Sequence, residues 1–301
     1  MRWSWAGAAT RGWATCCLCN SFGLLHHARI RSAQIDSTSF ATDRPRRAGH
    51  AMKLALLSDI HANIQALDAC LAHAHDQGAT RFAILGDLVG YGADPGAVVQ
   101  RVMALSQAGA LAIKGNHDDK AVHPPLVPKT IGDSTAAWTH AHLSTAERHF
   151  LDALPMLLQH ESILLVHASA EAPELWRYVY DRQAAARSLN AACALAGVRY
   201  VFGGHVHFQT LYFRNARGDV TQFLPICGVA IPVLRQHQWL ATIGSVGQPR
   251  DGNNSAMYAV LDTEVDQMTF YRVPYDHQAA AAAIRQAGLP DFFADRLLLG
   301  R

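Results

Sequence analysis

The sequence predicts an α/β fold, because strand-like and helix-like segments alternate over much of the chain. Short apolar runs of strand type recur between segments whose apolar residues repeat at helical spacing. Farther along, short strands follow one another and are separated by turn sequences, which indicates an antiparallel arrangement. We therefore expect an alternating first half followed by an antiparallel second half.

The alternating half begins at Met52. Strands are predicted at residues 53–58, 81–85, 110–114, 162–166 and 199–202. Helices are predicted at residues 63–77, from Asp94 through Val102, and at residues 134–154 and 181–196. Pro95 suits a first helical position, and Ser144 with Glu147 is expected to form a capping box in the second half of the third helix.

The antiparallel half contains short apolar runs separated by turn sequences at residues 215–219, 247–254 and 263–266. The runs are centred near Leu211, Phe223, Val229, Leu240, Tyr258 and Phe270. A helix from about Asp276 to Ala287 is the last element predicted.

Residues 1–51 show no periodicity and hold seven Arg against two acidic residues. We expect this segment to be a disordered arm or a non-native extension, with one domain at residues 52–290. An Arg-rich, acid-poor targeting peptide is a second interpretation. A metal-binding tract that uses Cys17 and Cys19 with His26 and His27 is a third, although these pairs lack a matched zinc spacing.

Composition narrows the function classes. The chain is 50% hydrophobic and 17% charged, which is ordinary for a globular protein. Residues 52–301 carry 19 basic and 22 acidic side chains, so a basic stripe for nucleic acid is not expected. No apolar run approaches the length of about 18 residues that spans a membrane. The body cysteines are scattered singly, which favours a reducing compartment and a cytoplasmic location.

Polar clusters follow five predicted strands, at the point where each strand ends. In chain order they are Asp59-Ile60-His61, Gly86-Asp87, Gly115-Asn116-His117-Asp118, His167 and Gly204-His205-Val206-His207. Ligands of α/β sheets bind outside the carboxyl ends of the strands, so the five clusters are expected to converge on one pocket. The glycines before Asp87, Asn116 and His205 permit sharp turns and close backbone approach.

The residue types in these clusters suit divalent first-row metals, which bind imidazole nitrogen and carboxylate oxygen. An Asp-x-His pair can send both side chains to one ion, and a single carboxylate such as Asp87 can bridge two ions. A lone histidine is more often a surface or core residue than a ligand. The ordered set of five clusters therefore carries the interpretation, and no single histidine does.

The clusters together resemble the calcineurin-like metallophosphoesterases, and the resemblance covers about Met52 to Val273. It is closest to the small bacterial members described as phosphodiesterases or diadenosine-tetraphosphatase-like. Two further stretches, residues 86–92 and 244–250, also look like that branch. The resemblance implies a four-layer α-β-β-α sandwich with mixed sheets.

The resemblance also implies the metal ligands and the reaction. One ion is expected to take Asp59, His61 and His207, the other to take Asn116, His167 and His205, and Asp87 to bridge them. A hydroxide between the ions would attack phosphorus in line. His117 would protonate the leaving oxygen, with Asp118 helping to hold it. The implied cofactors are two divalent ions among Mn, Fe, Ni and Zn, with Mn favoured.

One departure bears on the substrate. Protein phosphatases of this superfamily have Gly-Asp-x-x-Asp-Arg, but Gly90 and Tyr91 stand at the last two places here. This favours a small phosphodiester or a nucleotide, and we expect Asn63, Tyr91 and Arg250 to contact it. The alternatives for these residues are a local capping or surface role for Asn63 and Tyr91, and a solvated loop position for Arg250. The alternative functions are a phosphomonoesterase or protein phosphatase, a zinc hydrolase of another bond, and a non-catalytic scaffold on the same fold. No membrane or stable nucleic-acid partner is expected, and homo-oligomerisation is left open.

Overall fold

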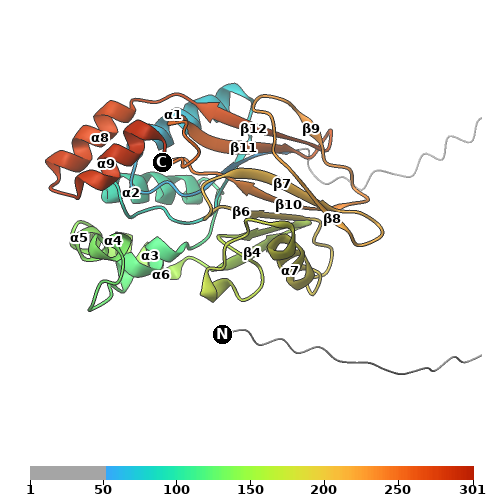
Figure 1. Cartoon of the computed structure of the whole chain (residues 1–301), viewed down its shortest axis with the longest axis horizontal. Coiled ribbons are helices and arrows are strands. Elements are labelled where there is room, and N and C mark those ends of the chain that lie inside the picture. Colours follow the sequence, from blue (N-terminus) through green and yellow to red (C-terminus); the bar gives the residue numbers. More distant parts are fainter. Residues whose placement is uncertain (1–51) are drawn as a thin grey trace, which may run out of the picture. The chain divides into compact units, whose positions relative to one another are not determined.

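The computed structural model describes residues 52–301 and arranges them as two six-stranded sheets that pack face to face between helices (Figure 1). The strand order of the first sheet is β3-β2-β1-β11-β12-β9, and that of the second is β4-β5-β6-β10-β7-β8. Each sheet mixes parallel and antiparallel pairs. The four-layer α-β-β-α sandwich with mixed sheets is therefore confirmed.

The first sheet joins the first three strands of the described residues to strands from the second half of the chain. Its members are β1 (Lys53–Leu57), β2 (Arg81–Ile84), β3 (Leu111–Ala112), β9 (Ile231–Pro232), β11 (Ala256–Asp262) and β12 (Gln267–Val273). β1, β2 and β3 run parallel, as the strand–helix alternation predicts. β11 lies antiparallel against the other edge of β1.

The second sheet is built from the middle of the chain. Its members are β4 (Leu157–His160), β5 (Ile163–Val166), β6 (Tyr200–Gly203), β7 (Gln209–Arg214), β8 (Val220–Phe223) and β10 (Gln238–Ile243). β6 lies parallel to both β5 and β10, and the remaining pairs are antiparallel.

Helices cover the outer faces of both sheets. Those before β4 are α1 (Ile64–Asp76), α2 (Pro95–Gln107), α3 (Asn116–Val122), α4 (Ile131–Ser134), α5 (Ala136–Ala141) and α6 (Thr145–Ala153). The later ones are the short helix η1 (Pro173–Leu175), α7 (Arg182–Ala192), α8 (His277–Gln286) and α9 (Asp291–Leu299). Figure 1 shows α1 above the strands and α7 below them.

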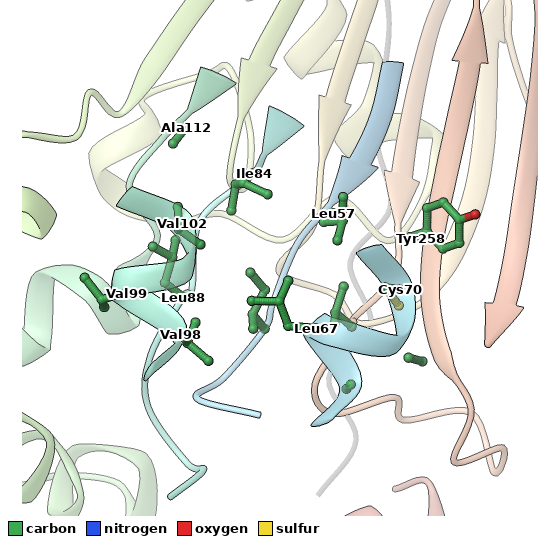
Figure 2. Close-up of a cluster of buried hydrophobic side chains, with 14 of the residues drawn as sticks. Leu57, Leu67, Cys70, Ile84, Leu88, Val98, Val99, Val102, Ala112 and Tyr258 are labelled. Carbon is green, nitrogen blue, oxygen red and sulfur yellow. The ribbon is translucent and has the colours of Figure 1, made fainter. Parts of the chain in front are cut away.

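The core has one apolar layer between the sheets and another under the helices on each side. β1 contributes to two of these layers, because successive side chains of a strand point to opposite faces. Leu54 and Leu56 point into the layer between the sheets, whereas Ala55 and Leu57 face α1 and α2. Figure 2 shows the layer between the first sheet and its helices, in which Leu57 packs with Leu67 of α1 and side chains of α2. A strand buried on both faces reads as a continuous apolar run.

Three predictions of the elements are corrected. The strands of the antiparallel half do not all pair successively along the chain, because β7, β8 and β10 join the second sheet and β9, β11 and β12 join the first. The helix expected at residues 134–154 is interrupted, and a new helix starts after Ser144, whose capping box with Glu147 is confirmed. The chain also continues past Ala287 into α9.

The interpretations of residues 1–51 lie outside the described residues. Within residues 52–301, no helix combines the length and the apolar character needed to cross a membrane.

Candidate metal centre

The predicted metal ligands and His117 lie just after the ends of five strands, three in the first sheet and two in the second. Asp59 and His61 follow β1, Asp87 follows β2, Asn116 and His117 follow β3 as the first residues of α3, His167 follows β5, and His205 and His207 follow β6. All of these residues are buried. The clusters therefore meet in one place, but at the shared end of two sheets rather than at the edge of one.

Five of these residues adopt a left-handed backbone conformation. Their φ angles lie between 50° and 66°, at Asp59, His61, Asp87, His205 and His207. Residues other than glycine seldom adopt this conformation, which costs about 1–3 kcal/mol at each position and is concentrated at functional sites. The N–H groups of Asp59 and His61 donate to the carbonyls of Gly86 and Asp87, each at 3.0 Å, so the first two loops hold each other in place.

Glycine is needed where the loops approach most closely. A Cβ at Gly115 would lie 2.2 Å from both the backbone nitrogen and Oδ1 of Asp87. A Cβ at Gly204 would lie 2.1 Å from Asp59 Oδ2. The prediction that glycines before Asn116 and His205 permit close backbone approach is confirmed.

The acidic and imidazole side chains form two groups of three. Asp59, His61 and His207 make the first group, and Asp87, His167 and His205 make the second. Within each group the ligand atoms lie within 4.8 Å of one another. Each group has the nitrogen and oxygen donors of a site for a divalent first-row metal.

Asp87 lies between the two groups. Its Oδ2 atom is 3.3 Å from His167 Nε2 in its own group and 3.8 Å from His61 Nε2 in the other. One carboxylate oxygen therefore faces ligand atoms of both groups, which is the position that a bridging carboxylate needs.

Both carboxylates are held by backbone donors through one oxygen only. Asp59 Oδ2 accepts a hydrogen bond from the His205 N–H at 2.8 Å, and Asp87 Oδ1 accepts one from the His117 N–H at 2.7 Å. The other oxygen of each faces the imidazoles, and Asp59 Oδ1 lies 3.1 Å from His207 Nε2. The backbone thus orients both carboxylates without using the oxygens that face the centre.

Three of the imidazoles are oriented in the same way. Their Nδ1 atoms lie close to backbone carbonyl oxygens: His61 at 3.2 Å from Val89, His167 at 2.7 Å from Leu85, and His207 at 2.6 Å from Gln248. When Nδ1–H donates to a carbonyl, the lone pair remains on Nε2, and this arrangement is common for metal-ligating histidines. The Nε2 atoms of His61 and His207 face each other at 3.1 Å.

The charges of the centre favour a cation. Burial raises the pKa values of Asp59 and Asp87, but neighbouring imidazoles outweigh it and hold both well below their usual range. Burial, followed by the charge of His167, lowers the pKa of His205 to about 3. Burial also lowers the pKa of His167, but the carboxylates of Asp87 and Asp59 outweigh it and raise this pKa to about 10. A proton on His167 supplies positive charge that a metal ion would supply instead.

Buried polar atoms without hydrogen-bond partners also agree with a bound cation. Among the described residues, Asp59 Oδ1, Asn116 Oδ1 and His167 Nε2 are buried and have no hydrogen-bond partner. Buried polar atoms without partners are rare and costly, so each one needs an explanation. Metal coordination would satisfy all three. The assignment of the seven side chains as ligands stays a prediction, and the geometry agrees with it.

His117 lies beside the centre and outside both groups of three. Its ring centre is 4.3 Å from that of Tyr91 and 5.2 Å from that of His61. Burial lowers its pKa to about 4.

Asp118 forms its hydrogen bonds with backbone groups. Its Oδ1 accepts from the N–H groups of Leu88 and Val89 at 2.8 and 3.2 Å, and its Oδ2 accepts from Gly115 N–H at 2.9 Å. It therefore holds the loop after β2 against the start of α3, and it forms no hydrogen bond with the His117 ring. Burial and the charge of Asp87 raise its pKa to about 7.

Two of the three expected substrate contacts lie on the His117 side of the centre. Tyr91 packs against His61 and His117, and the Arg250 guanidinium carbon lies 5.8 Å from the centre of the Tyr91 ring. Asn63 instead caps α1, where it accepts from Ala66 N–H and donates to the Gly247 carbonyl and the Tyr275 hydroxyl. Asn63 therefore has a capping role, and it also lines the cavity beside His61 and Tyr91, so the substrate contact expected for it stays a prediction.

Sequence reasoning missed several residues around the centre. Ser245 Oγ donates to the Asp59 carbonyl at 2.7 Å, so the stretch at residues 244–250 supports the first loop. The Tyr178 ring stacks on His205 at 4.1 Å, and Arg296 of α9 reaches Gln248 Oε1 at 3.3 Å. Only the stretch at 244–250 had a signal, because its resemblance to a family branch singled it out.

Comparisons with known proteins agree with this geometry. Residues 52–266 match the family model described as the calcineurin-like phosphoesterase superfamily domain. An uncharacterised protein of Methanocaldococcus jannaschii is 30% identical over 254 residues, which cover 82% of this chain and 98% of that protein.

Two solved structures have the same fold. A metallophosphoesterase from Sphaerobacter thermophilus is 30% identical, with a TM-score of 0.73 over 84% of this chain and 100% of its own. A hypothetical protein from Pyrococcus horikoshii is 18% identical, with a TM-score of 0.65 over 83% of this chain and 98% of its own. The second shows likeness of fold alone.

Proposed function

Because the chain belongs to the calcineurin-like phosphoesterase superfamily, we propose that it hydrolyses a phosphodiester or nucleotide-type phosphate ester with the help of two divalent metal ions. The observation that carries this proposal is the position of Asp87 Oδ2, which faces ligand atoms of both groups of three. Two separate mononuclear sites would not require a shared carboxylate.

The residues fit two ions as follows. Asp59, His61 and His207 would hold one, and Asn116, His167 and His205 would hold the other, with Asp87 shared between them. Two divalent ions there would neutralise phosphate charge and lower the pKa of a water between them. The backbone donors of His205 and His117 keep the carboxylates in place while a substrate binds.

His117 is our candidate for the proton donor. It is a buried imidazole beside the centre that belongs to neither group of three, so its nitrogen is available to a leaving oxygen. Burial keeps it neutral in the free protein, and an anionic phosphate nearby would raise its pKa and favour the protonated form.

A substrate panel on the metal-loaded protein tests the proposal. The panel compares a phosphomonoester, a phosphodiester, a cyclic nucleotide and a dinucleoside polyphosphate. We expect turnover of at least one diester or nucleotide and its loss on chelation. A protein that binds metal and turns over none of them would instead be a scaffold on this fold, and preference for the monoester would favour a phosphatase.

His117→Ala separates proton donation from metal binding. General acid catalysis contributes about 10²–10⁴-fold, and mainly when the leaving group is a strong base. We therefore expect this variant to keep both ions, to lose that factor on a nucleotide diester, and to lose much less on bis(p-nitrophenyl) phosphate. His205→Ala is the matched comparison and should lower metal content and slow both substrates. Equal slowing by His117→Ala, with chemistry rate-limiting, would contradict the assignment.

A further inference from the structure

Two arginines from distant parts of the chain meet beside the metal centre. Arg250 follows β10, and Arg296 belongs to α9. Both donate to one acceptor, the Gln248 side-chain oxygen, at 3.1 Å from Arg250 and 3.3 Å from Arg296. The fold therefore brings two positive charges to a single neutral amide.

The acidic residues near this pair are engaged elsewhere. Asp251, next to Arg250 in the chain, pairs with Arg272. Asp291 and Asp295, on the same helix as Arg296, both pair with Arg285. Within residues 52–301, neither Arg250 nor Arg296 forms an ion pair.

The pair carries the marks of an incomplete site. The Nε–H of Arg250 is buried and has no hydrogen-bond partner among the described residues. Burial, followed by the positive charge of Arg250, lowers the pKa of Arg296. Like charges held together without a counter-charge repel, and an anion would relieve this repulsion and also accept the unused hydrogen bond.

The pair is connected to the candidate reaction site. Gln248, whose side chain both arginines contact, uses its backbone carbonyl to accept from His207 Nδ1 at 2.6 Å. The Arg250 guanidinium carbon lies 5.8 Å from the Tyr91 ring centre, which is 4.3 Å from the His117 ring centre. An anion on the arginines would therefore lie beside Tyr91 and next to the centre.

We propose that Arg250 and Arg296 form a subsite for a second phosphoryl group, so that the substrate carries phosphate beyond the scissile one. This inference rests on the proposed function, because it names the substrate class of the same site. Guanidinium groups suit phosphate oxygens, since their N–H donors match phosphate geometry and their charge does not titrate away. A simple diester would leave this subsite empty.

Two chromogenic substrates test the subsite. The p-nitrophenyl esters of thymidine 5′-monophosphate and thymidine 5′-triphosphate share nucleoside and leaving group and differ in two phosphoryl groups. With excess metal, we expect the native protein to have a KM at least about tenfold lower for the triphosphate ester, the factor typical of one hydrogen bond to a charged group. Arg250→Gln and Arg296→Gln should each reduce this ratio to within about twofold.

Arg285→Gln is the matched control. Arg285 lies on α8, which packs against α9, and it already pairs with Asp291 and Asp295. Its removal should therefore leave the KM ratio unchanged. A ratio that survives in Arg250→Gln and Arg296→Gln would overturn the subsite. So would equal loss of kcat on both esters together with loss of metal, because that pattern indicates support of the His207 loop.

A second experiment distinguishes failure of the proposed function from failure of the subsite. If neither ester is hydrolysed, calorimetric titration of the chelated protein with inorganic tripolyphosphate decides the inference. Binding that weakens about tenfold in Arg250→Gln and Arg296→Gln, but not in Arg285→Gln, would support the subsite. Binding that is equal in all four proteins would overturn it.

Discussion

Gly204→Ala is the most direct test of how tightly the loops of the centre are packed. Gly204 lies outside the left-handed backbone region, so alanine adds one methyl group and no backbone strain. That methyl carbon would lie 2.0 Å from Ser58 Oγ and 2.1 Å from Asp59 Oδ2. The clash is therefore with a predicted metal ligand and with the residue before it.

The size of the effect follows from the distances. Non-bonded carbon and oxygen atoms need about 3 Å or more, so the two loops must separate by about 1 Å. The hydrogen bond from His205 N–H to Asp59 Oδ2 spans the same contact and would lengthen with it. Misplacement of a catalytic group by about 1 Å costs roughly 10²-fold in rate, and overpacking costs about 1–3 kcal/mol of stability.

The assay has three readouts: metal content by elemental analysis, turnover of bis(p-nitrophenyl) phosphate, and the thermal midpoint. We expect a folded protein with a lower midpoint, less metal and roughly 10²-fold lower turnover. Gly96→Ala is the matched control, because the nearest atoms to its Cβ would be the Glu147 side-chain oxygens at 3.5 and 3.7 Å and the His142 carbonyl oxygen at 3.8 Å, which are ordinary contacts. Native turnover with two bound ions in Gly204→Ala would refute the close-approach argument.

Three further predictions concern the charges of the centre. Asp87→Asn should lose at least one ion and nearly all turnover, and elemental analysis that finds two ions in an active variant would remove Asp87 from the bridging position. Asp118→Ala leaves three buried N–H groups without their acceptor at about 1–3 kcal/mol each, so urea titration should show the free energy of unfolding lowered by about 3 kcal/mol or more; a change below about 1 kcal/mol would contradict this role. In the chelated protein, the raised pKa of His167 gives stability that is full below the ordinary value of 6.5 and is lost toward about 10. The free energy of unfolding should thus fall from about pH 7 to 9 by at most about 1.4 kcal/mol per pH unit, and a slope unchanged in His167→Asn would assign it to another group.

The positions of the site loops were predictable because the signal is local. Each of the five strands is a short apolar run, and the polar residues that follow it mark where the strand ends. The two groups of three and the place of Asp87 between them agree with the expected ligand sets. Asn116 belongs to neither group of three, and its expected role as a ligand is supported by its buried side-chain oxygen, which has no hydrogen-bond partner among the described residues.

Strand pairing was not predictable because it is decided by contacts between distant residues. β10 and β11 are neighbours in the chain and have similar apolar patterns, yet β10 pairs with β6 and β11 pairs with β1. Nothing within either strand distinguishes these partners. The turn sequence at residues 247–254 therefore reads as a connection within one antiparallel run, although the chain passes there from one sheet to the other.

The hydrogen bonds formed by Asp118 and Asn63 were not predictable for a related reason. A carboxylate next to a histidine reads as its partner, but α3 turns the Asp118 side chain toward the backbone of the preceding loop. Asn63 stands at the start of a helix, where capping competes with any other role. Arg296 was overlooked because α9 was not predicted, and no local feature of α9 indicates that it reaches Gln248.

Each group of three draws ligands from both sheets. Asp59 and His61 follow a strand of the first sheet and His207 follows one of the second, while Asp87 belongs to the first and His167 to the second. An ion in either group would act as a removable crosslink, so the adhesion of the sheets would vary with the free metal concentration around the protein. A chain cut anywhere between Asp87 and His167 would leave both fragments without a complete group. Such fragments would recover ion binding only by rebuilding the whole sandwich, and added metal would in turn drive them to reassemble.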